Sequence, residues 1–149
     1  MAASARVTAL RSLKIRPRSI GEIKEKLANK GFGANEINET ISWLEANKLI
    51  DDRAFTKSWI QYRLARPFGF IRIIRELKQK GIAASIIDEA IAAAKEDYEG
   101  EETVLSIAKR RWERFQYVEP QKRKKRIYDY LLRRGFNPAE VMKAIKKLD

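Results

Sequence analysis

The feature that most constrains the fold is an internal repeat of a Leu-x-x-x-Gly pattern. Three segments align without a gap from Ile23, Ile73 and Ile127, and their starts are separated by 50 and 54 residues. In each segment an apolar residue follows the glycine at once, and further apolar residues recur at helical spacing. A repeat of this length is typical of chains built from stacked supersecondary units. The aligned pairs are Leu27/Gly31, Leu77/Gly81 and Leu131/Gly135.

The repeated segment predicts a helix–glycine turn–helix hairpin. Ile23 and Leu27 are four positions apart, so they lie on one face of a helix, and the same holds in the other two segments. Each glycine follows a basic residue at the end of the apolar stripe, where a helix C-cap favours a left-handed backbone. The second helices are expected to begin near Ala34-Asn35, Ala84-Ser85 and Asn137-Pro138, because these residues favour helix N-termini.

A further helix is predicted before each hairpin, over residues 5–13, 53–64 and 102–115. No run alternates with the period of two that a half-buried strand needs. The chain is therefore predicted to be all-α, with three tandem three-helix repeats over residues 1–50, 51–98 and 99–149. Repeats of about 50 residues are small for independent cores, so neighbours should share apolar surface in an elongated, curved array. The acidic segment 95–102 is predicted to be a hinge or spacer.

Two missing residue types exclude several kinds of chemistry. The chain has no cysteine and no histidine, which excludes disulfides, thiolate or imidazole metal sites and a histidine base. Asp51 and Asp52 are better explained as helix caps than as a metal pair, because no third ligand lies at useful spacing. The glycines are isolated and form no phosphate-binding loop. We therefore expect no cofactor, no metal and no catalytic residue.

The same sequence gives no sign of a membrane or secreted protein. No stretch approaches the ~18 apolar residues of a membrane span, and the N-terminal residues lack the continuous apolar segment of a secretory signal. A reduced, cytoplasmic location fits these features.

Positive charge is concentrated toward the C-terminus. The formal net charge is +12, and the successive segments 1–50, 51–100 and 101–149 contribute +4, +1 and +7. Between Lys109 and Arg134 there are 11 basic and 3 acidic residues. A merely solubilising surface usually mixes the two signs, so this distribution favours binding to nucleic acid or to a nucleoprotein assembly.

The basic residues are the candidate contacts with DNA or with an acidic protein surface, and the sequence does not separate the two partners. Trp43, Trp59 and Trp112 recur at apolar helical positions, which favours core packing over base stacking. The candidate binding residues are Arg16 and Arg18 in the first repeat, Arg66, Arg72 and Arg75 in the second, and Lys109, Arg110, Arg111, Arg114, Lys122, Arg123, Lys124, Lys125, Arg126, Arg133 and Arg134 in the third.

The order of these motifs resembles the RecX family, bacterial regulators of the RecA recombinase. The resemblance covers roughly residues 5–148. The segment from Arg18 to Leu27 is similar to the family's first helix pair, and Leu49-Ile50-Asp51-Asp52-Arg53-Ala54-Phe55 is similar to its Leu-Asp-Asp-x-x-Phe signature, with one extra residue before the aspartates. Residues 66–82 match an Arg-x-x-Gly-x-x-Arg-Ile-x-x-Glu-Leu-x-x-Lys-Gly-Ile element, and Leu132-Arg133-Arg134-Gly135-Phe136 matches the last element.

The resemblance implies a non-enzymatic regulator in DNA repair, recombination and the SOS response. RecX-like proteins bind along the groove of the RecA filament on single-stranded DNA and restrain its ATP hydrolysis, strand exchange and coprotease activity. The expected partners are thus the RecA filament and single-stranded DNA, and we expect a monomer. The alternative is a general DNA-binding helical protein that competes for single strands. A hydrolase that uses carboxylates alone is a weak third reading.

Overall fold

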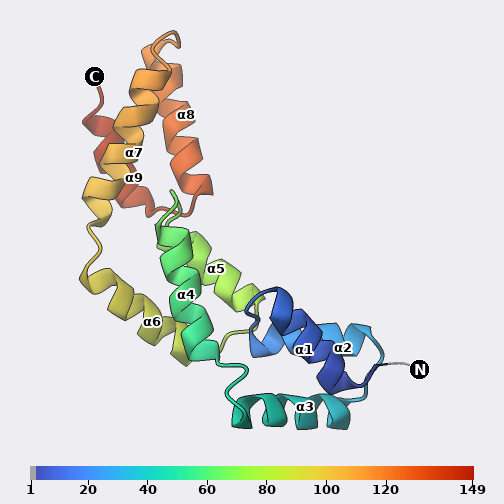
Figure 1. The fold of residues 1–149 in the computed structure, drawn as a ribbon. Helices are drawn as coiled ribbons and strands as arrows, with labels where there is room; N and C mark the ends of the chain where they lie inside the picture. The colour runs from blue at the N-terminus through green and yellow to red at the C-terminus, as the bar shows by residue number, and fades with distance from the viewer. Residues whose placement is uncertain (1–2) are drawn as a thin grey trace. The chain divides into compact units, whose positions relative to one another are not determined.

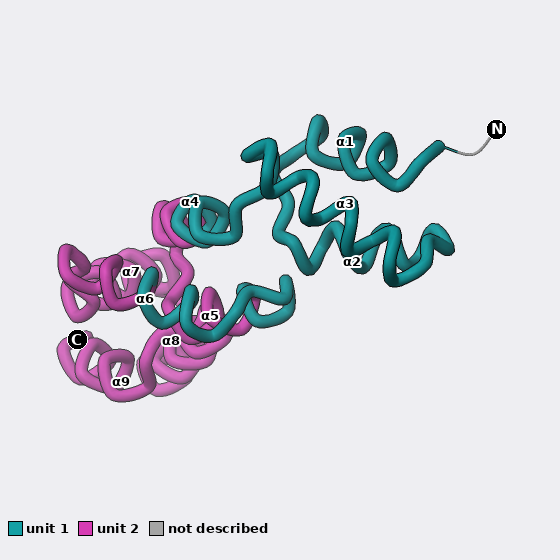
Figure 2. The backbone as a smooth tube through the Cα atoms, turned by 90° about the horizontal axis from the view of Figure 1, so that it is seen from below, with its two compact units in different colours: residues 1–59, 77–90 teal, residues 60–76, 91–149 magenta. Residues whose placement is uncertain are grey.

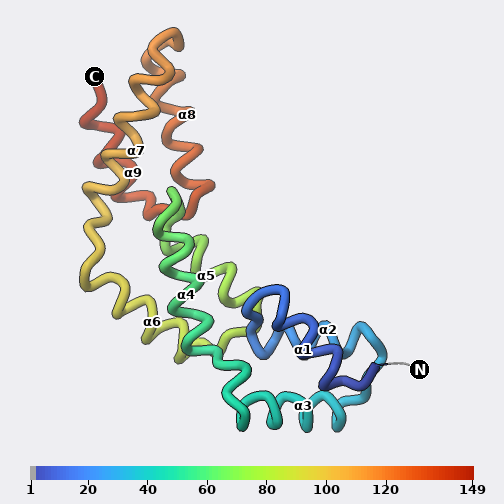
Figure 3. The backbone as a smooth tube through the Cα atoms, in the orientation of Figure 1, coloured from blue at the N-terminus to red at the C-terminus, as the bar shows by residue number. Residues whose placement is uncertain are grey.

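The computed structural model describes residues 3–149, and this part of the chain is helical throughout, without a strand (Figure 1). The all-α prediction is confirmed. The chain can be followed from end to end in Figure 3. The helices found in the described residues are α1 (Ala5–Ile15), α2 (Ile20–Asn29), α3 (Ala34–Ala46), α4 (Asp52–Leu64), α5 (Phe70–Gln79), α6 (Ala84–Glu96), α7 (Gly100–Arg114), α8 (Pro120–Arg133) and α9 (Pro138–Lys146).

The predicted hairpins are present, and each turns at its glycine. Gly31, Gly81 and Gly135 have φ angles of 91°, 76° and 90°, the left-handed conformation that closes a helix C-terminus. The second helices begin at Ala34, Ala84 and Pro138, as expected.

The connection in the acidic segment 95–102 is shorter than predicted, because most of the segment is helical. Helix α6 continues to Glu96 and α7 already begins at Gly100, so only residues 97–99 link them. Acidic side chains in the first turn of α7 are compatible with helix because they face its positive N-terminal end.

The chain forms two compact units, which Figure 2 colours separately. The first contains residues 1–59 and 77–90, and the second contains residues 60–76 and 91–149. Helices α1–α3 belong to the first unit and α7–α9 to the second, whereas α4, α5 and α6 each contribute residues to both. The middle repeat therefore does not form a compact unit of its own.

Each unit has its own apolar core. In the first, Ile23, Leu27 and Leu44 of α2 and α3 are at most 1% exposed, and Trp43 packs against the same cluster. In the second, Ile127 and Leu131 of α8 are fully buried with residues of α7 and α9, and Trp112 packs at the edge. The apolar stripes of the sequence are thus the faces by which the helices pack.

A glycine turn is also the place where one repeat contacts the next, and this junction occurs once inside each unit. In the first unit the Ser19 hydroxyl, at the N-cap of α2, donates to the Lys80 carbonyl oxygen at 2.6 Å. In the second unit the Gly69 amide, just before α5, donates to the Arg134 carbonyl oxygen at 2.8 Å. Helix-end groups that have no partner within their own helix are thereby satisfied.

The aspartates between the first two repeats act as caps, as predicted. The Asp51 carboxylate accepts hydrogen bonds from the amides of Arg53 (2.9 Å) and Ala54 (3.2 Å) at the start of α4. The Asp52 carboxylate accepts from the Ile20 amide at 2.8 Å, at the start of α2. Burial is the main reason why the pKa of Asp52 is raised.

Two glycines with the same backbone conformation should differ sharply in their tolerance of alanine. A Cβ on Gly31 would meet no atom within 4 Å, whereas a Cβ on Gly135 would lie closer than 3.0 Å to the backbone of Arg72. Gly31→Ala should therefore cost only the left-handed strain, about 1 kcal/mol. Gly135→Ala adds overpacking and should cost about 2–4 kcal/mol. Urea unfolding followed by circular dichroism measures the free energy of unfolding of each variant. Equal losses in the two variants would contradict the close contact between Gly135 and Arg72.

Candidate functional site

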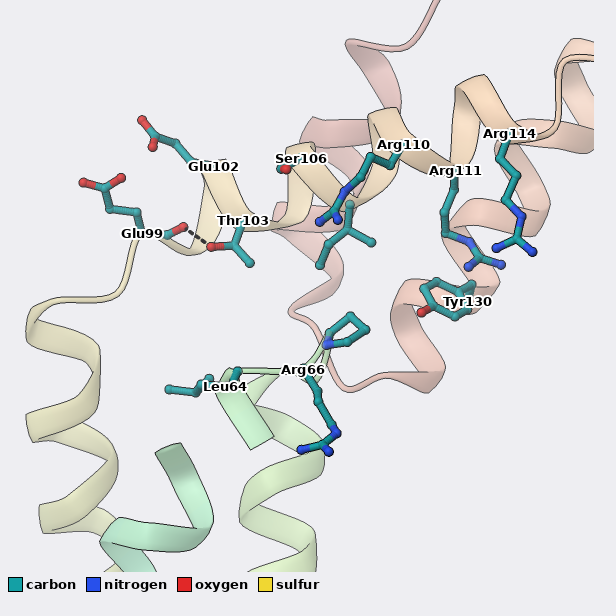
Figure 4. Close-up of a pocket in the computed structure, with 13 residues that line it drawn as sticks. Leu64, Arg66, Glu99, Glu102, Thr103, Ser106, Arg110, Arg111, Arg114 and Tyr130 are labelled. Atoms are coloured by element: carbon teal, nitrogen blue, oxygen red, sulfur yellow. Dashed lines mark hydrogen bonds between the residues drawn. The ribbon is translucent and has the colours of Figure 1, made fainter. Parts of the chain in front are cut away.

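A groove lined by arginines runs along α7 in the second unit (Figure 4). Its volume is about 810 Å³, within the range of small-ligand sites. We call it the arginine groove. One wall is the end of α4 and the turn that follows it, with Leu64, Ala65, Arg66 and Pro67. The other wall is α7 with its N-cap Glu99, and its lining residues are Glu102, Thr103, Ser106, Ile107, Arg110, Arg111 and Arg114. Tyr130 of α8 also lines the groove.

The two ends of the groove carry opposite charge. Glu102, Ser106, Arg110 and Arg114 are spaced by four residues, so they form one stripe along α7, acidic at its start and basic at its end. This order also stabilises the helix, because carboxylates favour its N-terminal end and guanidiniums its C-terminal end. At the acidic end, hydrogen bonding with Glu99 and the charge of that residue raise the pKa of Glu102.

Arg111 is fixed at the basic end by aromatic rings. Its guanidinium lies 3.5 Å from the Tyr130 ring centroid and 5.3 Å from that of Phe115. Figure 4 shows Arg111 and Arg114 extending from α7 on the side where Tyr130 lies. The Arg111 Nε is buried and has no hydrogen-bond acceptor among the described residues. The ring contacts thus orient the guanidinium without neutralising its charge.

Arg66 stands on the opposite wall. Its guanidinium stacks over the Tyr62 ring at 4.2 Å, and in Figure 4 it is directed away from α7. Arg66 is therefore a residue of the groove's rim rather than of its interior.

A second group of arginines surrounds one phenyl ring beside the groove. The guanidiniums of Arg63, Arg72 and Arg134 lie 4.6, 4.6 and 4.5 Å from the centroid of the buried Phe68 ring. Arg63 also pairs with Glu76 of α5, whereas Arg72 and Arg134 have no carboxylate partner among the described residues. Arg134 also lies 5.1 Å from the Tyr130 ring, which links this group to Arg111.

The structure thus brings together residues that the sequence analysis placed in separate repeats. Arg66 and Arg72, from the middle repeat, lie in the same unit as Arg110, Arg111, Arg114 and Arg134. The predicted residues of the second unit that are exposed and lie outside the groove lining are Arg75, Lys109, Lys122, Lys125, Arg126 and Arg133. Lys124 is half-buried, and Lys125 pairs with Asp129 at 3.1 Å.

The two candidates in the first unit are engaged with their own chain. Arg16 pairs with Glu22 at 2.5 Å, and the Arg18 Nε donates to the Ser12 carbonyl at 3.3 Å. Burial alone would raise the pKa of Glu22, but hydrogen bonds from Arg16 and from the Ser19 amide, with the positive charges of Lys80 and Arg16, outweigh it and lower the pKa. Arg16 is therefore partly neutralised and less available to an external anion.

Arg123 is a structural residue rather than a surface contact. Only 9% of it is exposed, and its guanidinium lies 3.9 Å from the Trp112 ring centroid. Its Nη2 donates to the carbonyl oxygens of Gln116 and Val118, both at 3.0 Å, and its Nε donates to that of Val118 at 3.2 Å. These bonds hold the turn between α7 and α8, so we omit Arg123 from the candidate surface.

Sequence reasoning did not identify the aromatic partners or the acidic end of the groove. Tyr62 is expected only as an apolar residue of the helix over 53–64, and Phe68 has no predicted role, although each lies near an arginine in the sequence. Tyr130 stands four residues before Arg134, the spacing at which helical side chains meet, and this was the one available signal. The described residues contain no group of acidic side chains arranged to hold a metal, and none of their helices is long and apolar enough to cross a membrane.

Replacement of two arginines on α8 by methionine should change the free energy of unfolding by different amounts. Arg123→Met leaves the carbonyls of Gln116 and Val118 without their donor and should lower the free energy of unfolding by about 1–3 kcal/mol. Arg126→Met removes an exposed side chain and should change it by less than about 0.5 kcal/mol. Urea unfolding of both variants measures the difference. A fully stable Arg123→Met variant would contradict the structural role of Arg123 and make it a candidate binding residue again.

Comparison with known proteins gives a consistent family. Three family models match the chain: RecX, first three-helix domain, over residues 5–44; RecX, second three-helix domain, over residues 51–91; and RecX, third three-helix domain, over residues 97–145. The predicted series of three-helix repeats is thereby confirmed.

Individual relatives carry the same name. The regulatory protein RecX of Pelodictyon phaeoclathratiforme is 31% identical over 141 residues, which cover 94% of this chain and 86% of the relative. That of Haemophilus influenzae (strain PittEE) is 32% identical over 121 residues, 80% of this chain and 78% of the relative.

Solved structures show the same fold. The crystal structure of RecX from Lactobacillus salivarius superposes with a TM-score of 0.79 at 23% identity, covering 97% of this chain and 94% of the other. A second crystal structure of regulatory protein RecX gives 0.77 at 24% identity, covering 95% and 70%. With the three matched domains and the identity to named relatives, these findings establish that the chain belongs to the RecX family of regulatory proteins.

Proposed function

We propose that this protein regulates the RecA recombinase by binding in the groove of the RecA filament on single-stranded DNA. Family membership is the observation that carries the proposal, because the relatives are named regulatory proteins. In this proposal the chain acts in the cytoplasm as a monomer and restrains ATP hydrolysis, strand exchange and coprotease activity.

The charge distribution supports this proposal. A filament on DNA is a polyanion, and the second unit carries guanidiniums at Arg72, Arg110, Arg114 and Arg134 that no carboxylate of the described residues neutralises. Such a surface raises the rate of encounter with a polyanion and contributes affinity through released counterions. The regulator needs no catalytic group of its own, since its effect on ATP hydrolysis is exerted on its partner.

The same unpaired arginines favour a second candidate function, general binding to single-stranded DNA in competition with RecA. The two functions differ in salt dependence. Pure phosphate binding weakens with a slope of about −0.7 in log affinity per log salt for each phosphate contacted on a single strand. A composite interface that includes buried contacts with protein retains more affinity at high salt.

Titration of the DNA-dependent ATPase of the cognate RecA tests the proposal. At fixed, saturating single-stranded DNA, we expect activity to fall when the protein is well below one copy per RecA. The physical reason is that one bound regulator affects more than one filament subunit.

Added single-stranded DNA is the control in this experiment. The proposal predicts that inhibition persists when extra DNA is supplied, because the target is the filament. Full recovery of activity with extra DNA, or no inhibition at all, would assign the protein to DNA sequestration instead.

A further inference from the structure

Three arginines of the second unit gather around one ring, and the nearby carboxylates do not balance their charge. The guanidiniums of Arg63, Arg72 and Arg134 all lie within 4.6 Å of the Phe68 centroid. Glu76 pairs with Arg63, whereas Arg72 and Arg134 have no carboxylate partner within the described residues. Like charges held this close repel one another, and an anion that binds between them relieves the repulsion.

Backbone contacts fix where Arg72 and Arg134 stand. Arg72 is in the first turn of α5, and Arg134 is the C-cap of α8. The Gly69 amide, just before α5, donates to the Arg134 carbonyl oxygen at 2.8 Å. The Arg72 guanidinium itself donates to the Arg133 carbonyl oxygen at 3.4 Å. Both side chains therefore start from fixed backbone positions, which lowers the entropic cost of ordering them on a ligand.

A further guanidinium continues the cluster toward the arginine groove. The Tyr130 ring lies 5.1 Å from the guanidinium of Arg134 and 3.5 Å from that of Arg111, which extends toward it from α7 (Figure 4). Arg111 has no ion pair within the described residues either. Arg72, Arg134 and Arg111, which we call the arginine track, thus form a series in which a ring joins each guanidinium to the next.

The rings of the arginine track are already engaged, so they do not provide platforms for bases. Phe68 is only 7% exposed, and half-buried Tyr130 is in contact with two guanidiniums. Stacking of a base requires an open ring face. Guanidiniums instead bind phosphate oxygens, through paired, charge-assisted hydrogen bonds. The arrangement therefore favours the phosphates of a strand over its bases.

An acidic protein surface fits the arginine track less well than a nucleic acid does. Interfaces between proteins centre on buried apolar or aromatic anchors, and their charged groups lie mainly at the rim. In the arginine track the rings of Phe68 and Tyr130 are in contact with the guanidiniums of their own chain, so they are poor anchors for a partner. Interfaces with nucleic acids are more positively charged, and most of their hydrogen bonds go to phosphate and sugar.

We propose that the arginine track binds the sugar–phosphate backbone of a single nucleic acid strand, with phosphates at Arg72, Arg134 and Arg111 and no stacking of bases on its rings. This deepens the proposed function, on which it rests for the source of the strand. Phosphate contacts position a strand and carry no sequence information, so the site accepts strands of any sequence.

The wild-type protein tests this mode of binding without RecA. Fluorescence anisotropy with labelled oligo(dT) and a labelled abasic strand of equal length, at pH 7.5 and over a series of salt concentrations, gives the two affinities. We expect them to agree within about threefold, because the backbone makes the contacts. A larger loss of affinity with the abasic strand, or no binding of either strand, would contradict the proposal.

Arg72→Gln/Arg134→Gln tests the residues, with Arg75→Gln/Arg133→Gln as its matched control. Each double variant removes one charge from α5 and one from the end of α8, and the control residues are exposed. The first variant should reduce affinity for oligo(dT) at least tenfold and lower the salt slope by about 0.7 for each phosphate no longer bound. The control should lose less than about threefold, with circular dichroism confirming that both variants fold.

Tyr117→Ala tests the alternative of base stacking. The Tyr117 side chain is 80% exposed in the turn before α8, at the opposite end of that helix from Arg134. Because the proposal needs no open ring, this variant should bind oligo(dT) as the wild type does. A reduction as large as that of Arg72→Gln/Arg134→Gln would assign the binding to stacking instead.

Two further results would overturn the proposal: equal reductions of affinity in the two double variants, or displacement of oligo(dT) by a poly-glutamate peptide as effectively as by unlabelled oligonucleotide. The ATPase titration keeps the two proposals distinct. Inhibition of RecA by a protein whose Arg72→Gln/Arg134→Gln variant still binds DNA normally would leave the proposed function standing and remove only this inference. Backbone binding by the arginine track without inhibition would do the reverse.

Discussion

The close approach of backbones at the glycine turns is the constraint on which the arrangement of the second unit depends. Gly135 lies against Arg72, and Gly69 against Gly135, at separations that leave no room for a Cβ at either glycine. Because the backbones meet there, the amides of Gly69 and Ile71 at the start of α5 find acceptors in the turn that follows α8. The same contact brings both Arg72 and Arg134 to the Phe68 ring. The arginines around Phe68 thus come together because the glycines, which have no side chain, allow the two backbones to meet.

Aromatic rings allow like charges to gather in this unit. Guanidinium groups are planar and weakly hydrated, so leaving water costs them less than it costs ammonium groups, and the negative face of a ring offsets part of their charge. Phe68 and Tyr130 serve Arg72, Arg134 and Arg111 in this way. A carboxylate in place of either ring would neutralise the arginines outright. Rings orient the guanidiniums and leave most of their charge for a ligand.

The helices, the glycine turns and the capping aspartates were predictable because each depends on residues close together in the sequence. The groove was not, because it needs the end of α4 to lie beside α7, and no local pattern specifies that approach. Arg123 and Arg126 illustrate the limit. They lie three residues apart on α8, yet one is buried on Trp112 and the other is exposed. The sequence gives both residues the same charge and helix, and only the packing of α8 on α7 makes one buried and the other exposed. The division into two compact units could not be predicted either, since three similar repeats give no reason to divide the middle one.

The charge order of α7 has a structural cause, but that cause does not account for where the side chains lie. Its dipole explains why carboxylates occupy the first turn and guanidiniums the last. It does not explain why those side chains line a cavity, or why the guanidiniums lack carboxylate partners within the described residues although Glu99 and Glu102 line the same groove. Ion pairs across the groove would fill it and cancel its field. Because the opposite charges are kept at opposite ends of one helix, they do not cancel one another along α7.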